Sequence, residues 1–345
     1  MPTTTDESFV DALPMHELHV HLEGSMPPET LLALARRHGT PGLPHDLDGI
    51  RRMYEFRDFD HFIVTYLTVV ENLRDSEDFR VLTEAVLDRL AAQGVRYAEI
   101  TWSPIIHTGR GLELMDVFAG LEAAREAAGA RGGPVVRWVT DLPGHLGPEA
   151  AEATLDLVLG LGGGVPPDSL VGFGLGGPEV DRRPFARAFA RAREAGLRSL
   201  PHAGETTGPE SVRAALDDLG ADRIGHGIAI AQDPVLMAAV AERGVVVEVC
   251  PTSNLRTRVV ASYAEHPLLR MIQAGVAVTV NSDDPPMFGT SIRQEHLVCL
   301  RELGLSRAQL VACTRTAATA GSAPAALVER TLADLAVVER EHVGA

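Results

Sequence analysis

The chain has few cysteines and an excess of acidic over basic residues. Each feature argues against a class of protein. Three cysteines, Cys250, Cys299 and Cys313, lie far apart among 345 residues. They do not form the disulfide framework of a small secreted domain, so we expect a reducing compartment. The chain has 31 Lys and Arg residues and 47 Asp and Glu residues, so its net charge is −16. This balance argues against nucleic acid or an anionic membrane as a partner, because binding phosphates requires clustered cations.

Long apolar runs are also missing. No stretch approaches the length needed to span a bilayer, and no basic segment followed by an apolar one opens the sequence. We therefore expect a soluble, cytoplasmic protein. The apolar share of 45% is ordinary for a protein with a full core.

Eight short apolar runs alternate with helical patterns along the chain. Runs without polar alternation indicate strands that are buried on both faces, as in a parallel sheet. Eight such units predict one α/β domain over residues 1–345, a (β/α)₈ TIM barrel with additional helices after the first strand and at the C-terminus. A doubly wound open sheet is the rival architecture, but it would separate the first strand from the last. The predicted strands lie around His19 and at residues 95–101, 135–140, 170–175, 197–202, 223–226, 245–249 and 276–280.

Histidines and a carboxylate end several of these strands. His19 and His21 alternate with aliphatic residues, so both imidazoles leave the same face of the first strand. Such a pair alone is more often structural than metal-binding. Downstream, however, His202 ends the fifth strand, His226 ends the sixth and Asp283 follows the eighth. The C-terminal ends of barrel strands form one rim, which carries the active site in this fold.

Zinc chemistry fits these residues. Three imidazoles and one carboxylate suit a single zinc ion with one position left for water, and we expect these ligands to be His19, His21, His202 and Asp283. Zinc would lower the pKa of its water toward neutrality. His226 would then be free to hold that water or to deprotonate it. Glu205, three residues beyond a ligand, could pass a proton to the substrate.

Four motifs occur in order along the chain: His19-x-His21, His202-Ala203-Gly204-Glu205, Gly225-His226-Gly227 and Ser282-Asp283-Asp284-Pro285. Together they resemble the signature set of the adenosine deaminase family of metal-dependent hydrolases. The resemblance covers essentially the whole chain. It implies a zinc-containing barrel that removes the 6-amino group of a purine by hydrolysis.

The resemblance also implies individual roles. Glu205 would protonate the purine ring nitrogen next to the reacting carbon, while His226 and Asp283 orient the attacking hydroxide. Asp284 would hydrogen-bond the imidazole side of the purine. Gly177 resembles the glycine whose backbone approaches the purine, where a side chain would be in the way. His21 and Glu23 are the remaining expected substrate contacts in this part of the site.

The sequence departs from two known substrate patterns. Adenosine deaminases proper resemble His-x-His-Leu-Asp, whereas this chain has Glu23, which is familiar from adenine deaminases. Those relatives usually carry a serine pair where Gly176 and Gly177 stand. Arg256 and Arg258 follow the seventh strand and could pair with an anionic group, or they could be ordinary surface cations.

We therefore expect an adenine nucleoside with a carboxylate-bearing 5′ substituent, 6-amino-6-deoxyfutalosine of menaquinone biosynthesis, as the substrate. Adenosine is the first alternative and adenine the second. A catalytically inactive binding protein is disfavoured, because the set of acid and base residues is complete. A hydrolase acting on another amide or ring with the same metal site is a further alternative. The sequence does not predict an oligomeric state.

Overall fold

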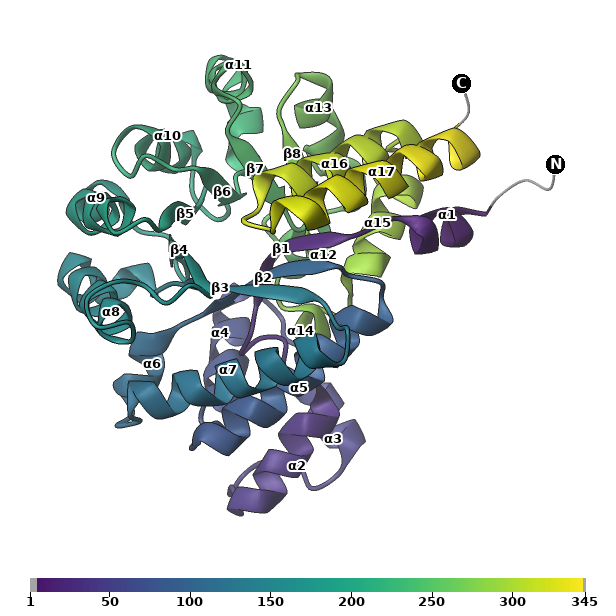
Figure 1. Ribbon diagram of the computed structural model, residues 1–345. Helices are drawn as coiled ribbons and strands as arrows, with labels where there is room; N and C mark the ends of the chain where they lie inside the picture. The colour runs from purple at the N-terminus through teal and green to yellow at the C-terminus, as the bar shows by residue number, and fades with distance from the viewer. Residues whose placement is uncertain (1–4, 344–345) are drawn as a thin grey trace.

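The computed structural model describes residues 5–343 and contains eight parallel strands in sequence order (Figure 1). Each strand pairs in parallel with the next, which confirms the predicted barrel. The ends of the predicted 1–345 domain lie outside the described residues. The strands are β1 His16–His21, β2 Tyr97–Trp102, β3 Val135–Thr140, β4 Leu170–Leu175, β5 Arg198–Ala203, β6 Arg223–His226, β7 Val246–Val249 and β8 Val278–Val280.

The residues just after β8 bring the last strand against the first. The Asp283 N–H donates to the His19 carbonyl oxygen at 3.0 Å, and the His21 N–H donates to the Asp283 carbonyl oxygen at 2.9 Å. Nearby, the Glu17 carboxylate accepts the N–H of Ser282 at 2.9 Å. An open doubly wound sheet could not make these contacts. The backbone of Asp283 therefore joins the two ends of the sheet, and its side chain is one of the predicted metal ligands.

Helices separate the strands and pack around the barrel. Side chains cap the first turns of α5 Ser76–Ala92 and α11 Pro234–Arg243, because Asp75 accepts the N–H of Asp78 and Asp233 accepts the N–H groups of Val235 and Leu236. The outer helices are α5 Ser76–Ala92, α7 Leu114–Ala130, α8 Pro148–Gly160, α9 Ala186–Glu194, α10 Pro209–Asp217, α11 Pro234–Arg243 and α13 Leu268–Gln273. Short helices at the strand ends are α6 Pro104–Thr108, α12 Pro251–Arg256 and α14 Pro285–Phe288. Single 3₁₀ turns are η1 Gly144–Leu146, η2 Arg183–Phe185, η3 Ile228–Gln232 and η4 Tyr263–Glu265.

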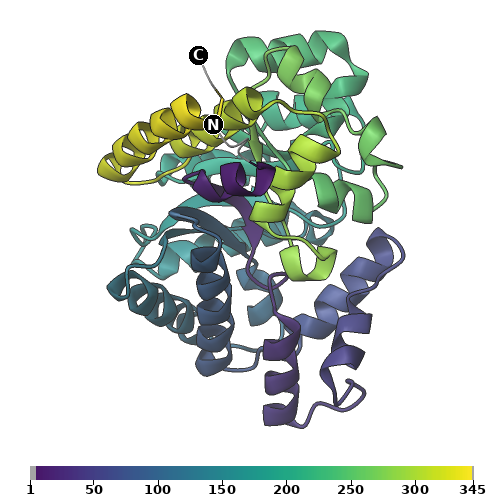
Figure 2. The ribbon, with the colours of Figure 1, turned by 90° about the vertical axis from the view of Figure 1, so that its right-hand side faces the viewer.

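The additional helices lie where they were predicted. After β1 come α2 Pro28–His38, α3 Leu47–Met53 and α4 Phe59–Val70, and the C-terminal group is α15 Ile292–Arg301, α16 Arg307–Ala320 and α17 Ala325–His342. Figures 1 and 2 show α2–α4 extending from one side of the molecule and α16 and α17 covering the opposite side. No helix in the described part of the chain is both long and apolar enough to cross a membrane.

Two local predictions differ from the structure. The sequence pattern from Tyr54 to Leu73 predicts one helix, whereas α4 spans only Phe59–Val70, because Asp58 caps it by accepting the N–H of His61. The polar N-terminal segment contains a helix that was not predicted, α1 Asp6–Ala12, which buries Phe9 and Val10. The segment has too few apolar residues to form a helical pattern in the sequence. Its helix is recognised only in the structure, where Phe9 and Val10 pack against the rest of the chain.

Candidate active site

The four predicted metal ligands meet at the C-terminal rim of the barrel. His21 Nε2 lies 3.2 Å from His202 Nε2 and 3.4 Å from Asp283 Oδ1. His19 Nε2 lies 3.6 Å from the same Asp283 oxygen. Two ligand atoms on one tetrahedral zinc ion, each roughly 2.1 Å from it, are about 3.4 Å apart. The spacing of these side chains therefore fits a single ion.

The electrostatic state of the cluster also fits a cation. His19 Nε2 and His202 Nδ1 are buried without a hydrogen-bond partner among the described residues. Burial lowers the pKa of His21 to about 4 and that of His202 well below its usual value, so both rings are neutral with lone pairs available. Burial opposes a charge on His19 as well, but Asp283 and Glu248 raise its pKa to about 10. The carboxylates thus favour positive charge at this point.

A second layer of charged side chains orients His19. Its Nδ1 lies 3.0 Å from Oε2 of Glu248 in β7, and Glu248 pairs in turn with the buried Arg223. Burial opposes ionisation of Glu248, but Arg223 and His19 lower its pKa to about 2. The charged carboxylate accepts the Nδ1–H of His19 and leaves the Nε2 lone pair facing the cluster, as is common for metal-binding histidines. Sequence reasoning missed Glu248, whose only signal was a carboxylate inside an apolar strand.

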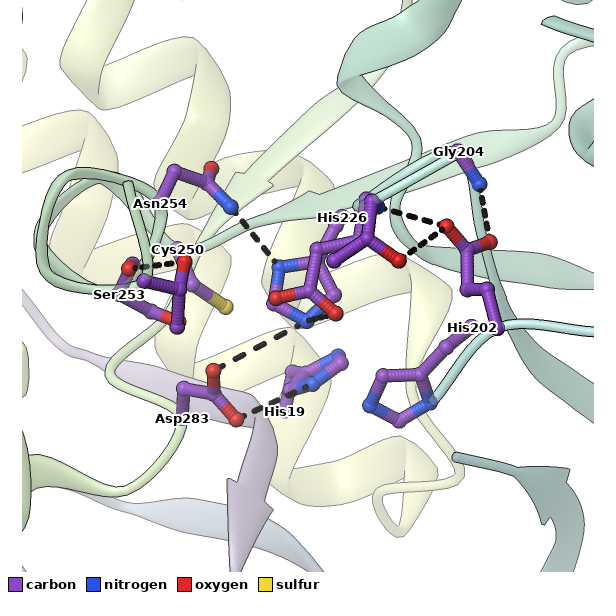
Figure 3. Close-up of polar contacts among 12 residues, drawn as sticks. His19, His202, Gly204, His226, Cys250, Ser253, Asn254 and Asp283 are labelled. Carbon is purple, nitrogen blue, oxygen red and sulfur yellow. Dashed lines mark hydrogen bonds and ion pairs between the residues drawn. The ribbon is translucent and has the colours of Figure 1, made fainter. Parts of the chain in front are cut away.

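Glu205 and His226 lie beside the cluster. His226 Nε2 is 3.7 Å from Glu205 Oε2 and 3.8 Å from Asp283 Oδ2 (Figure 3). Burial raises the pKa of Glu205 well above its usual value, and the charges of Asp283 and Glu179 add to this effect. Burial therefore favours the neutral, protonated form of Glu205, which is the form that a general acid needs.

Two of these residues have strained backbones. His226 has a φ of 59° and Asp283 a φ of 65°, in the left-handed region that favours glycine. Such conformations persist where the surrounding structure imposes them, and they cluster at functional sites.

Glu179 fixes the loop that carries Glu205. Its carboxylate accepts the backbone N–H groups of Gly204, Thr206 and Thr207 at 2.6–2.7 Å. The buried Arg182 lies 3.3 Å from the same carboxylate and donates through Nε to the His202 carbonyl oxygen at 2.9 Å. The sequence motif around Gly177 contains Glu179, but nothing in its spacing revealed this role.

A cavity of about 450 Å³ opens in front of the cluster. Its polar wall includes most of the predicted site residues, namely His21, Gly177, His202, Glu205, His226, Asp283 and Asp284. The opposite wall is largely apolar and comes from α4, with Phe59, Phe62, Ile63, Tyr66 and Leu67. The aromatic residues of α4 therefore pack against the core and also line the cavity.

Two further carboxylates face the cavity. Burial raises the pKa of Asp284 well above its usual value, and the charge of Asp283 adds to the shift. Burial therefore favours the protonated form of Asp284, which can donate a hydrogen bond. Asp141, which follows β3, accepts a hydrogen bond from the Ser103 hydroxyl, and burial raises its pKa to about 7. Asp141 was not predicted, although its place after a barrel strand could have indicated it.

The structure places the remaining predicted substrate contacts away from the cavity lining. Glu23 is 1% exposed, and its Oε1 lies 2.7 Å from His107 Nε2 and accepts the Ser103 N–H at 3.1 Å. The guanidinium of Arg256 lies over the Phe56 ring, 5.1 Å from its centroid, and Arg258 is exposed to solvent. The short helix α12 turns both arginines aside, a feature that the sequence did not predict.

Arg110 is the arginine that does line the cavity. It donates to the Leu73 carbonyl oxygen at 2.8 Å, and its Nη2 lies 3.0 Å from His107 Nδ1. Its Nε is buried without a hydrogen-bond partner among the described residues. Glu23 therefore acts on the cavity indirectly, since it holds His107 and His107 contacts Arg110.

Comparisons with known proteins agree with this geometry. The sequence model of the adenosine deaminase family matches residues 14–337. Aminodeoxyfutalosine deaminase of Streptomyces avermitilis is 47% identical over 330 residues, which cover 95% of this chain and 92% of that protein. Adenine deaminase of Rhodospirillum rubrum is 40% identical over 336 residues, 96% of this chain and 99% of that protein. A Burkholderia ambifaria amidohydrolase crystallised with bound zinc superimposes with a TM-score of 0.87 at 26% identity, over 100% of this chain and 97% of that one. This chain therefore belongs to the adenosine deaminase family of metal-dependent hydrolases.

Proposed function

We propose that this protein holds one zinc ion and hydrolyses the 6-amino group of a 5′-modified adenine nucleoside, 6-amino-6-deoxyfutalosine, with release of ammonia. The ligands would be His19, His21, His202 and Asp283. The observation that carries the proposal is that Glu205, whose pKa is raised by burial, lies in the wall of one cavity together with the imidazole cluster. The 47% identity to an aminodeoxyfutalosine deaminase supports the substrate. The reaction would belong to menaquinone biosynthesis in the cytoplasm.

Each residue of the rim would have a separate role in the deamination. Zinc bound there would lower the pKa of a water molecule to near neutrality. Glu205 gives its proton to the ring nitrogen next to the amino-bearing carbon, which makes that carbon more electrophilic. His226 and Asp283 orient the water for attack on this carbon. Asp284 donates a hydrogen bond from its protonated carboxyl to the imidazole side of the purine.

The far end of the cavity supports a substrate larger than adenine. The aromatic wall from α4 suits an aryl group, which gains free energy from leaving water. The chain contains no lysine, so an anionic substituent must be recognised by arginine, histidine or neutral donors. Arg110 has the right charge and lines the cavity. We therefore assign the 5′ carboxylate to Arg110 in place of Arg256 and Arg258.

Adenine is the second candidate substrate. Glu23 matches the pattern expected for enzymes that act on the free base, and an adenine deaminase is 40% identical to this chain. An enclosed site for the base alone would leave most of the apolar wall without a function. Adenosine fits the cavity but makes no use of Arg110.

The test is ammonia release from the three compounds by zinc-loaded protein. We expect kcat/KM to be highest for 6-amino-6-deoxyfutalosine; a much faster turnover of adenosine or adenine would overturn the substrate assignment. Arg110→Ala should raise KM for the carboxylate substrate about 10–100-fold, since a hydrogen bond to a charged group contributes about 1.5–3 kcal/mol. It should leave KM for adenosine nearly unchanged. The matched control, Arg256→Ala, should change neither KM.

A further inference from the structure

A relay of buried side chains leads away from His226. The amide Nδ2 of Asn254, in α12, lies 3.2 Å from His226 Nδ1 (Figure 3). On its other side, Asn254 Oδ1 lies 3.2 Å from His266 Nε2. The relay ends at the backbone N–H of Leu268, which donates to His266 Nδ1 at 3.2 Å. All three side chains are buried.

The backbone N–H at the end of the relay sets its direction. This group can only donate, so His266 Nδ1 must present a lone pair and the proton of that ring must be on Nε2. The Nε2–H of His266 then donates to the carbonyl oxygen of Asn254. With its oxygen so engaged, Asn254 must turn its amide N–H₂ group toward His226.

The consequence for His226 is a defined tautomer. Because His226 Nδ1 accepts the hydrogen bond from Asn254, it carries no proton, and the proton of the ring is on Nε2. That nitrogen is the one that faces Glu205 and Asp283 across the cavity, at 3.7 and 3.8 Å. His226 therefore presents an N–H group to the site.

We propose that Asn254 and His266 are positioning residues that keep the proton of His226 on Nε2, so that His226 holds the attacking water as a hydrogen-bond donor and does not remove its proton. The proton of the water then passes to a carboxylate of the rim. This catalytic consequence rests on the proposed deaminase function, whereas the tautomer is a property of the folded chain alone.

The tautomer can be measured directly. Two-bond ¹H–¹⁵N correlation spectra of histidine-labelled, zinc-loaded protein separate protonated from unprotonated ring nitrogens, and a His226→Gln spectrum identifies the signals of His226. We expect Nε2 of His226 to be protonated and Nδ1 to be unprotonated. The opposite pattern would overturn the proposal whatever the activity of the enzyme, and this result stands even if no adenine compound is deaminated.

Variants of the relay test its effect on catalysis. Asn254→Asp replaces the donor with a carboxylate of the same shape and should draw a proton to His226 Nδ1. We expect kcat to fall by roughly 10²-fold, with KM and bound zinc nearly unchanged. His266→Leu removes the group that orients Asn254 and should also lower kcat. His266→Gln keeps an N–H donor and should retain most of the activity.

A merely structural role would give a different pattern. If the two residues only support folding, Asn254→Asp and His266→Leu should lower the melting temperature and the fraction of active enzyme. The ring protonation of His226 in the molecules that do fold should then stay as in the wild type. An Asn254→Asp protein in which His226 is protonated on Nδ1 and unprotonated on Nε2, with an unchanged kcat, would overturn the donor role of His226. If that variant does not fold, the wild-type spectrum together with the His266→Gln and His266→Leu pair still decides the proposal.

Discussion

Asp284 occupies the space in which a side chain at position 24 would begin. A Cβ built on Gly24 would lie 1.4 Å from Asp284 Oδ1, far inside any allowed contact. The predicted purine-binding carboxyl is therefore placed by a glycine three residues beyond the second metal-binding histidine. The pair joins the turn after β1 to the turn after β8.

Gly24→Ala should displace Asp284 and weaken its hydrogen bond to the purine. We expect kcat/KM to fall by roughly 5- to 150-fold, because a lost hydrogen bond to a buried polar group costs about 1–3 kcal/mol. Steady-state kinetics and thermal unfolding would measure the effect. Gly129→Ala is the control, since no atom lies within 4 Å of its Cβ and the helix should gain roughly 0.5–1 kcal/mol. Unchanged kinetics in Gly24→Ala would show that Asp284 does not contact the substrate.

Glu205→Gln should separate acid catalysis from metal binding. The amide keeps the shape of the protonated carboxyl but cannot transfer its proton, so kcat should fall by roughly 10²–10⁴-fold. Zinc content, measured by elemental analysis, should match the wild type. Glu210→Gln, at an exposed position of the following helix α10, serves as the control and should be fully active. Retention of kcat in Glu205→Gln would exclude this residue as the acid.

Removal of zinc should abolish activity and lower the melting temperature. A metal that binds only the folded state stabilises it by about 2.7 kcal/mol when its concentration is 100 times the dissociation constant. Dialysis against a chelator and subsequent addition of zinc should therefore lower and restore both properties. His202→Ala should bind no zinc, whereas His145→Ala, which alters a cavity residue outside the cluster, should bind it normally. Purified protein that contains no metal and does not respond to zinc would contradict the assignment.

Glu295 should make the stability depend on pH. Burial raises its pKa from 4.5 to about 7. Between these values the folded chain keeps a proton that the unfolded chain has lost, so stability falls as the pH rises through this window, by roughly 3 kcal/mol, and is level above pH 7. Glu295→Gln stays neutral and can still accept the N–H of Thr252, which Glu295 accepts at 2.9 Å.

The free energy of unfolding of Glu295→Gln should therefore exceed that of the wild type by an amount that grows from pH 4.5 to pH 7 and then stays constant. Urea unfolding at a series of pH values would measure this difference. The exposed Glu302→Gln is the matched control and should show no such trend. A difference that does not vary with pH would mean that Glu295 ionises normally in the folded protein.

The sequence predicted the barrel and the grouping of the metal ligands because each ligand stands at the end of an apolar strand. His19, His202 and Asp283 are far apart in the chain, but the fold rule that places strand ends on one rim brings them together. No equivalent rule predicted Glu248 and Glu179. Their partners come from distant elements, and only the three-dimensional packing identifies them.

The structure places three of the predicted substrate contacts away from the cavity lining, and the reason is local. Arg256 and Arg258 follow a strand, as the ligands do, but helix α12 begins at Pro251 and turns their side chains away from the cavity. Glu23 follows β1 by two residues, yet it points toward His107 and Ser103. Position after a strand predicts nearness to the rim, whereas the direction of a side chain depends on the turn that follows.

The contacts of Asp283 with β1 also have a consequence for synthesis. The chain leaves the ribosome from its N-terminus, so the first two proposed metal ligands, His19 and His21, emerge early and the last proposed ligand emerges only with residue 283. Until then β1 lacks its neighbour from the end of the barrel, and three imidazoles at most can hold an ion. Metal loading of the complete site must therefore come late in translation or after it, and a truncated product that ends before β8 would be an inactive, incompletely closed sheet.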